Sequence, residues 1–167
     1  MKKFNYTMNH KAGETYMAKM CHEGWAATSL VEGVWTFEPC SPDQYTFRVC
    51  YLRGKTNAEV EELKRSLAAE GIEFVSRYSF WAIFRSEHDF MLYTPEEELV
   101  IIEKIRRPML AGSVLSWLAF LAVLLLAIKV SAWFGILCVL LAVYAVMCSC
   151  LGISYTRLAH RMRRGKR

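Results

Sequence analysis

Residues suited to acid–base or metal chemistry are scattered along this chain. The four histidines are His10, His22, His88 and His160. A metal site needs several converging ligands, often seen as paired histidines at helical spacing, but His10 and His22 lie twelve positions apart. The segments His22-Glu23 and Glu87-His88-Asp89 place an imidazole beside a carboxylate, the pairing used in acid–base catalysis. Neither segment has an obvious nucleophile nearby, so we expect surface histidines and no metal.

The cysteines and the glycines give no catalytic signature. The six cysteines are Cys21, Cys40, Cys50, Cys138, Cys148 and Cys150. None of them forms a C-x-x-C pair, which disfavours a zinc or redox site. The sequence also lacks the phosphate-binding P-loop, the dinucleotide-binding G-x-G-x-x-G motif and the G-x-S-x-G nucleophile motif. We therefore expect a protein that is not an enzyme and that needs no cofactor.

One stretch, 109–156, is apolar enough to enter a membrane. Its only charged residue is Lys129. Met109–Ile128 supplies 20 uncharged residues and Ala132–Thr156 supplies 25, against roughly 20 needed to cross the hydrocarbon core of a bilayer. Lys129–Ser131 is left for the turn. The pattern predicts a two-helix transmembrane hairpin.

Basic residues flank this hairpin, whereas the preceding part of the chain is nearly neutral. Residues 1–94 carry 11 Lys or Arg and 12 Asp or Glu. The tail carries six basic residues and no acidic ones: Arg157, Arg161, Arg163, Arg164, Lys166 and Arg167. The positive-inside rule then places both termini in the cytoplasm, at the plasma membrane. We expect the tail to contact anionic lipid headgroups. Direct binding of nucleic acid is not expected, because no aromatic residue after Tyr155 could stack on bases.

The soluble part alternates helical and strand patterns in an order that occurs twice. Strands are predicted near Phe4–Thr7, Trp25–Val31, Val34–Glu38, Tyr45–Leu52, Ile72–Tyr78 and Phe80–Arg85, and helices at Asn9–Glu23 and Asn57–Glu70. An offset of 47 positions carries Gly24 to Gly71 and Phe37 to Phe84. The order β-α-β-β followed by β-α-β-β indicates an internal duplication. It predicts an α+β fold with one antiparallel sheet and both helices on a single face.

Aromatic residues point to both faces of that sheet. Phe80 and Phe84 point to one face, while Trp81 and Ile83 point to the other. Either the last strand is central and buried on both sides, or an open face receives a ligand or a second protein chain. Burial is the favoured alternative. The residues nominated for ligand or partner binding are Trp35, Phe47, Tyr51, Trp81 and Phe84.

A helix start separates the soluble part from the membrane part. Thr94 can cap a helix, Pro95 suits its first position, and Glu97 completes a capping box. Pro108 predicts a break at the membrane surface. The chain is thus divided into an α+β cytoplasmic domain (1–94), a connecting amphipathic helix (95–108), the transmembrane hairpin (109–156) and a basic cytoplasmic tail (157–167).

Several short motifs resemble a bacterial family catalogued as domain of unknown function 2812. They include W-x-F-E at Trp35–Glu38, Y-x-F-R-V-x-Y-L at Tyr45–Leu52, W-x-x-F-R at Trp81–Arg85 and L-Y-T-P-E-E-E at Leu92–Glu98. The resemblance covers about residues 1–107, and several similar proteins carry a C-terminal membrane hairpin. Family members are often encoded beside PadR-type transcriptional regulators, which implies a regulatory partnership. The family brings no established catalytic residues.

Three classes of function remain for the chain. The first is a membrane-anchored cytoplasmic sensor or regulatory binding domain, with the bilayer and a PadR-type regulator as partners. The second is an anchor or scaffold subunit of a larger membrane complex, including a homo-oligomer. The third, a membrane-bound enzyme, has the least support from the residues.

Overall fold

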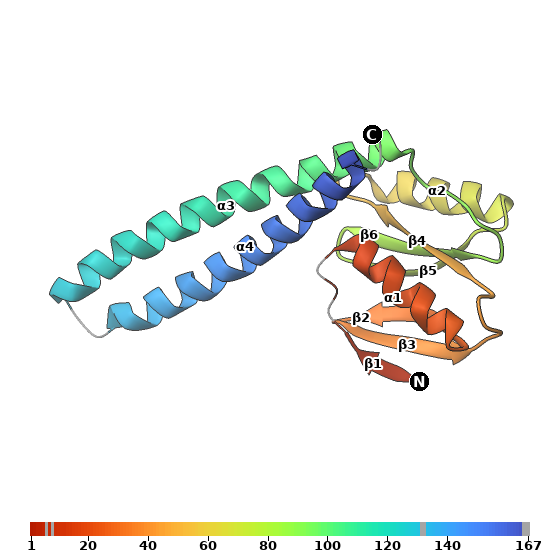
Figure 1. Cartoon of the computed structure of the whole chain (residues 1–167), viewed down its shortest axis with the longest axis horizontal. Helices are drawn as coiled ribbons and strands as arrows, with labels where there is room; N and C mark the ends of the chain where they lie inside the picture. The colour runs from red at the N-terminus through yellow and green to blue at the C-terminus, as the bar shows by residue number, and fades with distance from the viewer. Residues whose placement is uncertain (6, 8, 131–132, 165–167) are drawn as a thin grey trace. The chain divides into compact units, whose positions relative to one another are not determined.

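The chain divides into two compact units, and each is described by itself. The computed structural model describes residues 1–5, 7, 9–130 and 133–164, with side-chain surroundings described outside 125–137. The first unit is Met1–Leu92 and the second is Tyr93–Arg167. Figure 1 shows strands and short helices in the first unit, and long helices in the second.

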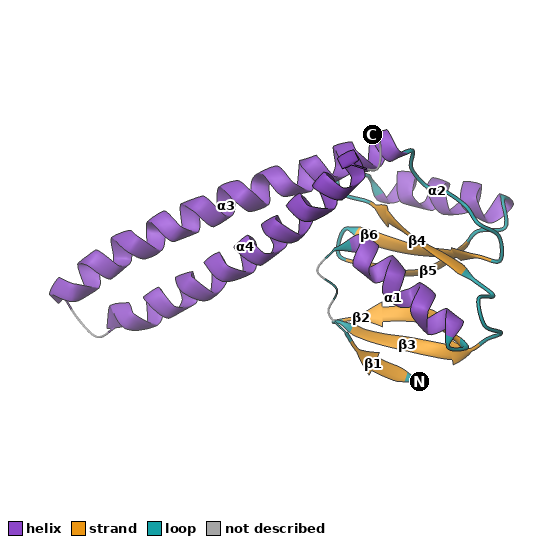
Figure 2. Ribbon diagram, viewed as in Figure 1, coloured by secondary structure: helices purple, strands orange, loops and turns teal. Residues whose placement is uncertain are grey.

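The first unit contains six strands and two helices among its described residues. They are β1 (Lys2–Phe4), α1 (His10–His22), β2 (Trp25–Val31), β3 (Val34–Pro39), β4 (Thr46–Tyr51), α2 (Asn57–Ala69), β5 (Glu73–Tyr78) and β6 (Trp81–Ser86). Figure 2 shows this succession of strands and helices. The predicted order β-α-β-β, repeated once, is confirmed. The first strand lies earlier than Phe4–Thr7, because Lys2 and Phe4 pair with Thr36 and Val34 of β3.

The second half repeats the first at a constant offset of 47 positions. Helix α2 and strand β6 begin and end 47 positions after α1 and β3. Gly24 and Gly71 end the two helices with φ of 83° and 76°, a region that glycine enters without steric cost. In the two hairpin turns, Glu32 and Ser79 have φ of 49° and 53°. The internal duplication therefore holds for backbone conformation as well as for element order.

The expectation of one antiparallel sheet needs correction, because each half forms its own three-stranded sheet. The strand orders are β1-β3-β2 and β4-β6-β5. The sheets meet where β2 lies beside β5. There the Ser76 hydroxyl accepts a hydrogen bond from Leu30 N–H at 3.3 Å and donates one to Leu30 C=O at 3.5 Å. Irregularities between Ala27 and Ser29, and between Phe74 and Ser76, shift the register. Such bulges bend a strand and interrupt its ladder, and both lie on β2 and β5, the strands that face each other where the sheets meet.

The placement of both helices on one face also needs correction. Helix α1 lies between the sheets and packs against β2 and β4. Phe47 and Ile83 share a buried cluster with Met17 of α1. Helix α2 covers the opposite face of β4-β6-β5, where the Lys64 ammonium lies 4.1 Å from the Phe74 ring centroid and Phe74 contacts Phe84. Because successive strand residues point to opposite faces, α1 and α2 flank this sheet from two sides.

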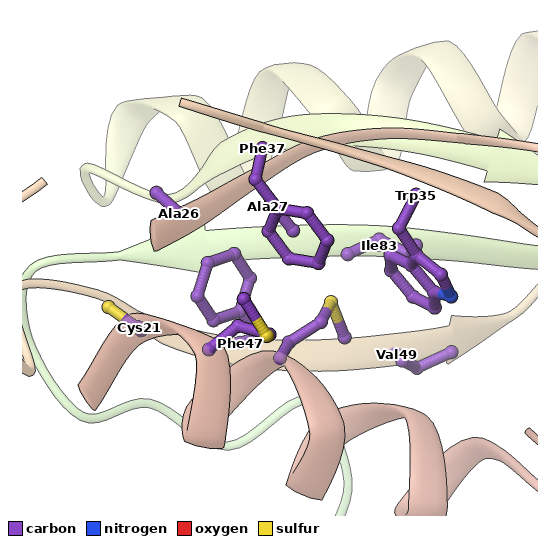
Figure 3. Packing of buried hydrophobic residues seen from close by; sticks show 10 residues of the cluster. Cys21, Ala26, Ala27, Trp35, Phe37, Phe47, Val49 and Ile83 are labelled. Atoms are coloured by element: carbon purple, nitrogen blue, oxygen red, sulfur yellow. The ribbon is translucent and has the colours of Figure 1, made fainter. Parts of the chain in front are cut away.

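Strand β6 is therefore the central strand of its sheet and is buried on both sides. Of the two explanations for its aromatic residues, burial or an open binding face, burial is the favoured one. Ala82, Ile83 and Phe84 are all at most 2% exposed. Figure 3 shows the α1 side of this core, where side chains from both sheets meet over the helix. The largest buried ones there include Trp35 and Phe47. Two separate apolar layers thus hold the first unit together.

The second unit consists of α3 (Pro95–Val130) and α4 (Trp133–Arg164). The predicted helix start is confirmed. Thr94 Oγ1 accepts from Glu97 N–H at 3.3 Å, and the Glu97 carboxylate accepts from Thr94 N–H at 2.8 Å. The break predicted at Pro108 is wrong, since α3 runs through it. Proline in a helix interior removes one backbone hydrogen bond and crowds the carbonyl of the residue four positions earlier, which can kink a helix without ending it.

Both long helices are long and apolar enough to cross a membrane. Ser113 and Ser149 join them through a hydrogen bond of 2.7 Å between their hydroxyls. A Cβ atom added to Gly152 would lie 2.9 Å from Cδ2 of Leu110, so the backbone of α4 lies against this side chain. Small residues that permit such an approach are typical of membrane helix pairs. Of the predicted turn Lys129–Ser131, the first two residues belong to α3 and Ser131 lies outside the described residues.

Candidate functional site

The structure separates the five nominated binding residues into two groups. Trp35, Phe47 and Phe84 are at most 2% exposed, so they are core residues and present no surface to a ligand in this conformation. The Trp35 indole N–H is already used, because it donates to Asn5 C=O at 3.0 Å. Tyr51 and Trp81 are partly exposed and their ring centroids lie 4.8 Å apart. Only these two of the nominated residues come together at a surface.

Tyr51 and Trp81 belong to a row of aromatic side chains that crosses three adjacent strands. Trp81 of β6 is the register partner of Tyr51 in β4 and of Tyr78 in β5. Directly opposed residues in antiparallel strands point to the same face, so the three rings follow one another across the sheet. Tyr78 is 38% exposed. We call Tyr51, Trp81 and Tyr78 the aromatic row.

Two neighbouring elements border the aromatic row. At the start of α1, the His10 ring stacks on Trp81 with centroids 5.2 Å apart and an interplanar angle of 20°. At the β5–β6 turn, Phe80 is 51% exposed and the Arg53 guanidinium lies 5.5 Å from its ring centroid. Leu52 N–H donates to Phe80 C=O at 2.7 Å and ties this turn to the end of β4. Flat aromatic rings thus make up the row, and an exposed cation lies over Phe80 at the neighbouring turn.

This composition suits binding by stacking and apolar contact. Tryptophan, tyrosine and arginine are the residue types most enriched among the energetically dominant contacts of protein interfaces. Aromatic rings also gain about 0.5–1.5 kcal/mol from favourable mutual geometry beyond the area they bury. A planar group, an apolar side chain or an arginine of a partner would each find complementary surface here.

The other histidines lie elsewhere. His22 Nδ1 is 2.8 Å from the Asp43 carboxylate, and this hydrogen bond together with the negative charge raises the pKa of His22. His88 N–H donates to the Ser86 hydroxyl at 3.3 Å, and His160 is exposed on α4. Within the described part of the chain, no three His, Cys, Asp or Glu side chains are placed to hold one metal ion.

Arg85 forms the main ionic link between the two sheets. Its guanidinium contacts Glu38 of β3 at 2.7 Å and Glu73 of β5 at 2.8 Å, and it lies 4.6 Å from the Tyr45 ring centroid. Its side chain is 18% exposed. The link joins the β1-β3-β2 sheet to the β4-β6-β5 sheet, which carries the aromatic row.

The basic residues nominated for lipid contact lie at the end of α4. Arg157, Arg161, Arg163 and Arg164 are exposed there, whereas Lys166 and Arg167 fall outside the described residues. Arg163 forms an ion pair with Glu103 of α3. Glu103 also pairs with Arg107 at 3.5 Å. The charged ends of the two helices are therefore joined to each other.

The sequence pattern missed His10, Tyr78, Phe80 and Arg53 as part of the site. Tyr78 and Phe80 could have been found, because a hairpin turn at Ser79 places them next to Trp81. The stack between His10 and Trp81 joins positions 71 residues apart, and no local pattern signals it.

The fold defines the chain as a mixed α+β unit followed by two candidate membrane-spanning helices. Residues 9–110 match the family described as "Protein of unknown function (DUF2812)", and the chain belongs to that family. The matched range includes the first unit from the cap of α1 onward and the beginning of α3. No match is found among the curated proteins or among the solved structures.

Proposed function

We propose that this chain is a membrane-anchored binding protein whose first unit is a cytoplasmic sensor or regulatory domain. The observation that carries the proposal is the aromatic row, Tyr51, Trp81 and Tyr78, partly exposed across three strands of a well-packed sheet. Exposing a cluster of this composition to water is unfavourable because of the hydrophobic effect. Covering it with a partner removes apolar surface from water and so favours binding. The mode of action is binding rather than catalysis.

The second unit serves as the anchor. Side chains along both helices, among them Leu115, Leu118, Val139 and Val143, are more than half exposed. Such apolar surface is suited to lipid chains rather than to water. Arg157, Arg161, Arg163 and Arg164 would then lie at headgroup level, where each basic side chain near an anionic surface contributes about 1 kcal/mol. Lys166 and Arg167 continue this series in the sequence.

Orientation gives the first prediction. Both termini are expected in the cytoplasm, because basic residues precede α3 and follow α4. A phosphatase that is active only outside the membrane, fused after Arg167, should be inactive, and a fluorescent protein at the same place should be active. As a control, the same phosphatase inserted between α3 and α4 should be active. Phosphatase activity after Arg167 would contradict the proposed orientation.

The leading partner candidate is a PadR-type transcriptional regulator, because the family to which the chain belongs is often encoded beside such regulators. Binding at the membrane surface would hold the regulator away from DNA. A ligand or a membrane perturbation that altered the affinity by about 1.4 kcal/mol would change the equilibrium constant tenfold. One aromatic contact can supply that amount.

Arg48 provides a structural route between the binding surface and the segment that leads toward α3. Its guanidinium donates to Phe90 C=O at 3.1 Å and pairs with Asp89 at 2.8 Å. Arg48 belongs to β4, three residues before Tyr51 of the aromatic row. A change in the position of β4 would therefore reach the 87–92 segment through these two bonds.

The second prediction tests the aromatic row directly. Fragment 1–107 should bind a PadR-type regulator from the same genome, and Trp81→Ala should weaken this binding by roughly tenfold or more, because it removes the central ring. Phe4→Ala is the matched control, since Phe4 is 74% exposed and lies on the other sheet. The dissociation constants are measured by biolayer interferometry. Equal affinity of both variants would exclude the aromatic row as the interface. If the unmodified fragment does not bind the regulator, the proposed partner is wrong.

A scaffold role is the second candidate, and one observation favours it. Phe4 and Val31 are 74% and 63% exposed, and both pair with Val34 of β3. They therefore share one face of the β1-β3-β2 sheet. A second protein chain, including another copy of this one, could cover that face in a larger membrane complex. Loss of assembly in Phe4→Ala with unchanged regulator binding would support this role.

A further inference from the structure

Cys21 and Cys40 lie side by side although 19 positions separate them. Their sulfur atoms are 3.8 Å apart. Cys21 is in the last turn of α1 and Cys40 directly follows β3. A disulfide needs sulfurs at about 2.05 Å, so a shift of less than 2 Å would join them.

The backbone already holds the two cysteines together from both sides. Cys40 N–H donates to Gly24 C=O at 3.0 Å, and Asp43 N–H donates to Cys21 C=O at 3.2 Å. The Cys21 sulfur also accepts a hydrogen bond from Tyr45 N–H at 3.4 Å. These bonds fix the segment 40–45 against the end of α1. Only side-chain rotation and a small adjustment of this segment separate the thiol pair from a bond.

The two thiols differ in access to solvent. Cys21 is 1% exposed, whereas Cys40 is partly exposed. A small oxidant can therefore meet Cys40 first, with Cys21 directly behind it. This is the arrangement of an attacking thiol and a resolving thiol.

We infer that Cys21 and Cys40 form a reversible disulfide site whose co-reactant is a low-molecular-weight disulfide. In the first step the Cys40 sulfur attacks the small disulfide, which breaks its S–S bond. Cys40 then carries a mixed disulfide, one small thiol leaves, and the proton lost by Cys40 goes to that thiol. In the second step Cys21 attacks the Cys40 sulfur and breaks the mixed disulfide, and the proton lost by Cys21 goes to the second small thiol as it leaves. The protein dithiol is oxidised, and one small disulfide is reduced to two thiols.

The surroundings set the rate of the first step. Burial, and then the hydrogen bond with Cys21, raise the pKa of Cys40 to about 11. Since the thiolate is the attacking form, exchange is slow near neutral pH and accelerates roughly tenfold per pH unit below that pKa. At neutral pH the pair therefore reacts slowly, and its oxidation calls for a high concentration of the small disulfide.

Oxidation would lock the end of α1 to the segment after β3. The closed loop contains both β2 and β3, so the β1-β3-β2 sheet would be tied to α1 by a covalent bond. Cross-links that close such loops restrict the unfolded chain and stabilise the fold. The site is independent of the proposed partner binding and of membrane anchoring.

The test uses the full chain in detergent micelles with oxidised glutathione as the probe, at neutral pH and at about pH 9. Free thiols are alkylated, and peptides are mapped by mass spectrometry. We expect two of the six cysteines to lose reactivity, faster at the higher pH, with a cross-linked peptide joining Cys21 to Cys40. Cys50→Ala is the matched control, since Cys50 is also buried in the first unit, and it should leave the cross-link intact.

The single cysteine variants separate the two steps. Cys21→Ser should trap glutathione on Cys40, because the resolving thiol is gone, and Cys40→Ser should abolish both products. If Cys21→Ser does not fold, the cross-linked peptide of the unmodified chain still tests whether Cys21 and Cys40 form a disulfide. A glutathione adduct on Cys40 that never resolves, a cross-link to another cysteine, or no modification at either pH would overturn the inference.

Discussion

Replacing Phe47 with alanine should lower the free energy of unfolding of the first unit by about 3–5 kcal/mol. Phe47 is 1% exposed and lies in the apolar cluster between α1 and the two sheets. Removing its ring forfeits hydrophobic transfer energy and leaves a cavity that packed neighbours fill only in part. The measurement is urea unfolding of fragment 1–94, followed by tryptophan fluorescence.

Phe4→Ala is the control for this prediction. The Phe4 ring is 74% exposed, so its loss should change the free energy of unfolding by no more than about 0.5 kcal/mol. A similar loss in both variants would show that the cluster around Phe47 is not the main core. Residues 1–94 are expected to fold without the membrane part, because they carry their own apolar pattern and a nearly neutral charge. An absent cooperative transition in the unmodified fragment would contradict that expectation.

Local features of this fold were accessible from the sequence because single residues determine them. Asn9 accepts from Ala12 N–H at 2.9 Å and caps α1. Gly24 and Gly71 end the two helices in conformations that favour glycine. Thr94 and Glu97 form the capping box that starts α3. The duplication was also visible, since an offset of 47 positions relates both the glycines and the elements between them.

The tertiary arrangement was not accessible, because it depends on residues far apart in the chain. The two sheets meet at β2 and β5, whose irregularities lie near Thr28 and Val75, equivalent positions of the two repeats. The placement of α1 between the sheets decided which aromatic residues became core. Strand alternation alone gave Phe47 and Tyr51 the same face, yet α1 buries Phe47 and leaves Tyr51 partly exposed near its beginning.

The candidate site was therefore predicted in part. Trp81 and Tyr51 belong to the aromatic row, whereas Trp35, Phe47 and Phe84 fill the interior. Aromatic content signals surface to be buried, but it does not say whether another part of the same chain will cover it. The positions of α1 and α2 on the two faces of the β4-β6-β5 sheet decide which aromatic side chains are buried and which stay at the surface.

Two glutamates at equivalent positions of the repeats also differ in burial, because α1 lies between the sheets and α2 lies on the outside. Glu14 of α1 and Glu61 of α2 are 47 positions apart, and each pairs with a lysine of its own helix. The Glu14 side chain is 10% exposed and accepts a hydrogen bond from Val49 N–H at 2.9 Å. Val49 belongs to β4, an edge strand of its sheet. The Glu61 side chain is 57% exposed on the outer helix.

Glu14→Ala should therefore lower the free energy of unfolding by about 1–3 kcal/mol, because it leaves a buried backbone N–H without its acceptor. Glu61→Ala should change it by no more than about 0.5 kcal/mol. Both substitutions put the same residue into a helix interior, so the gain in helix propensity cancels in the comparison. Glu14→Gln keeps an acceptor oxygen and should recover most of the loss. Urea unfolding of fragment 1–94 measures all three variants. Equal losses for Glu14→Ala and Glu61→Ala would mean that the carboxylate does not protect the edge of β4, and that the two repeats are energetically as alike as their backbones.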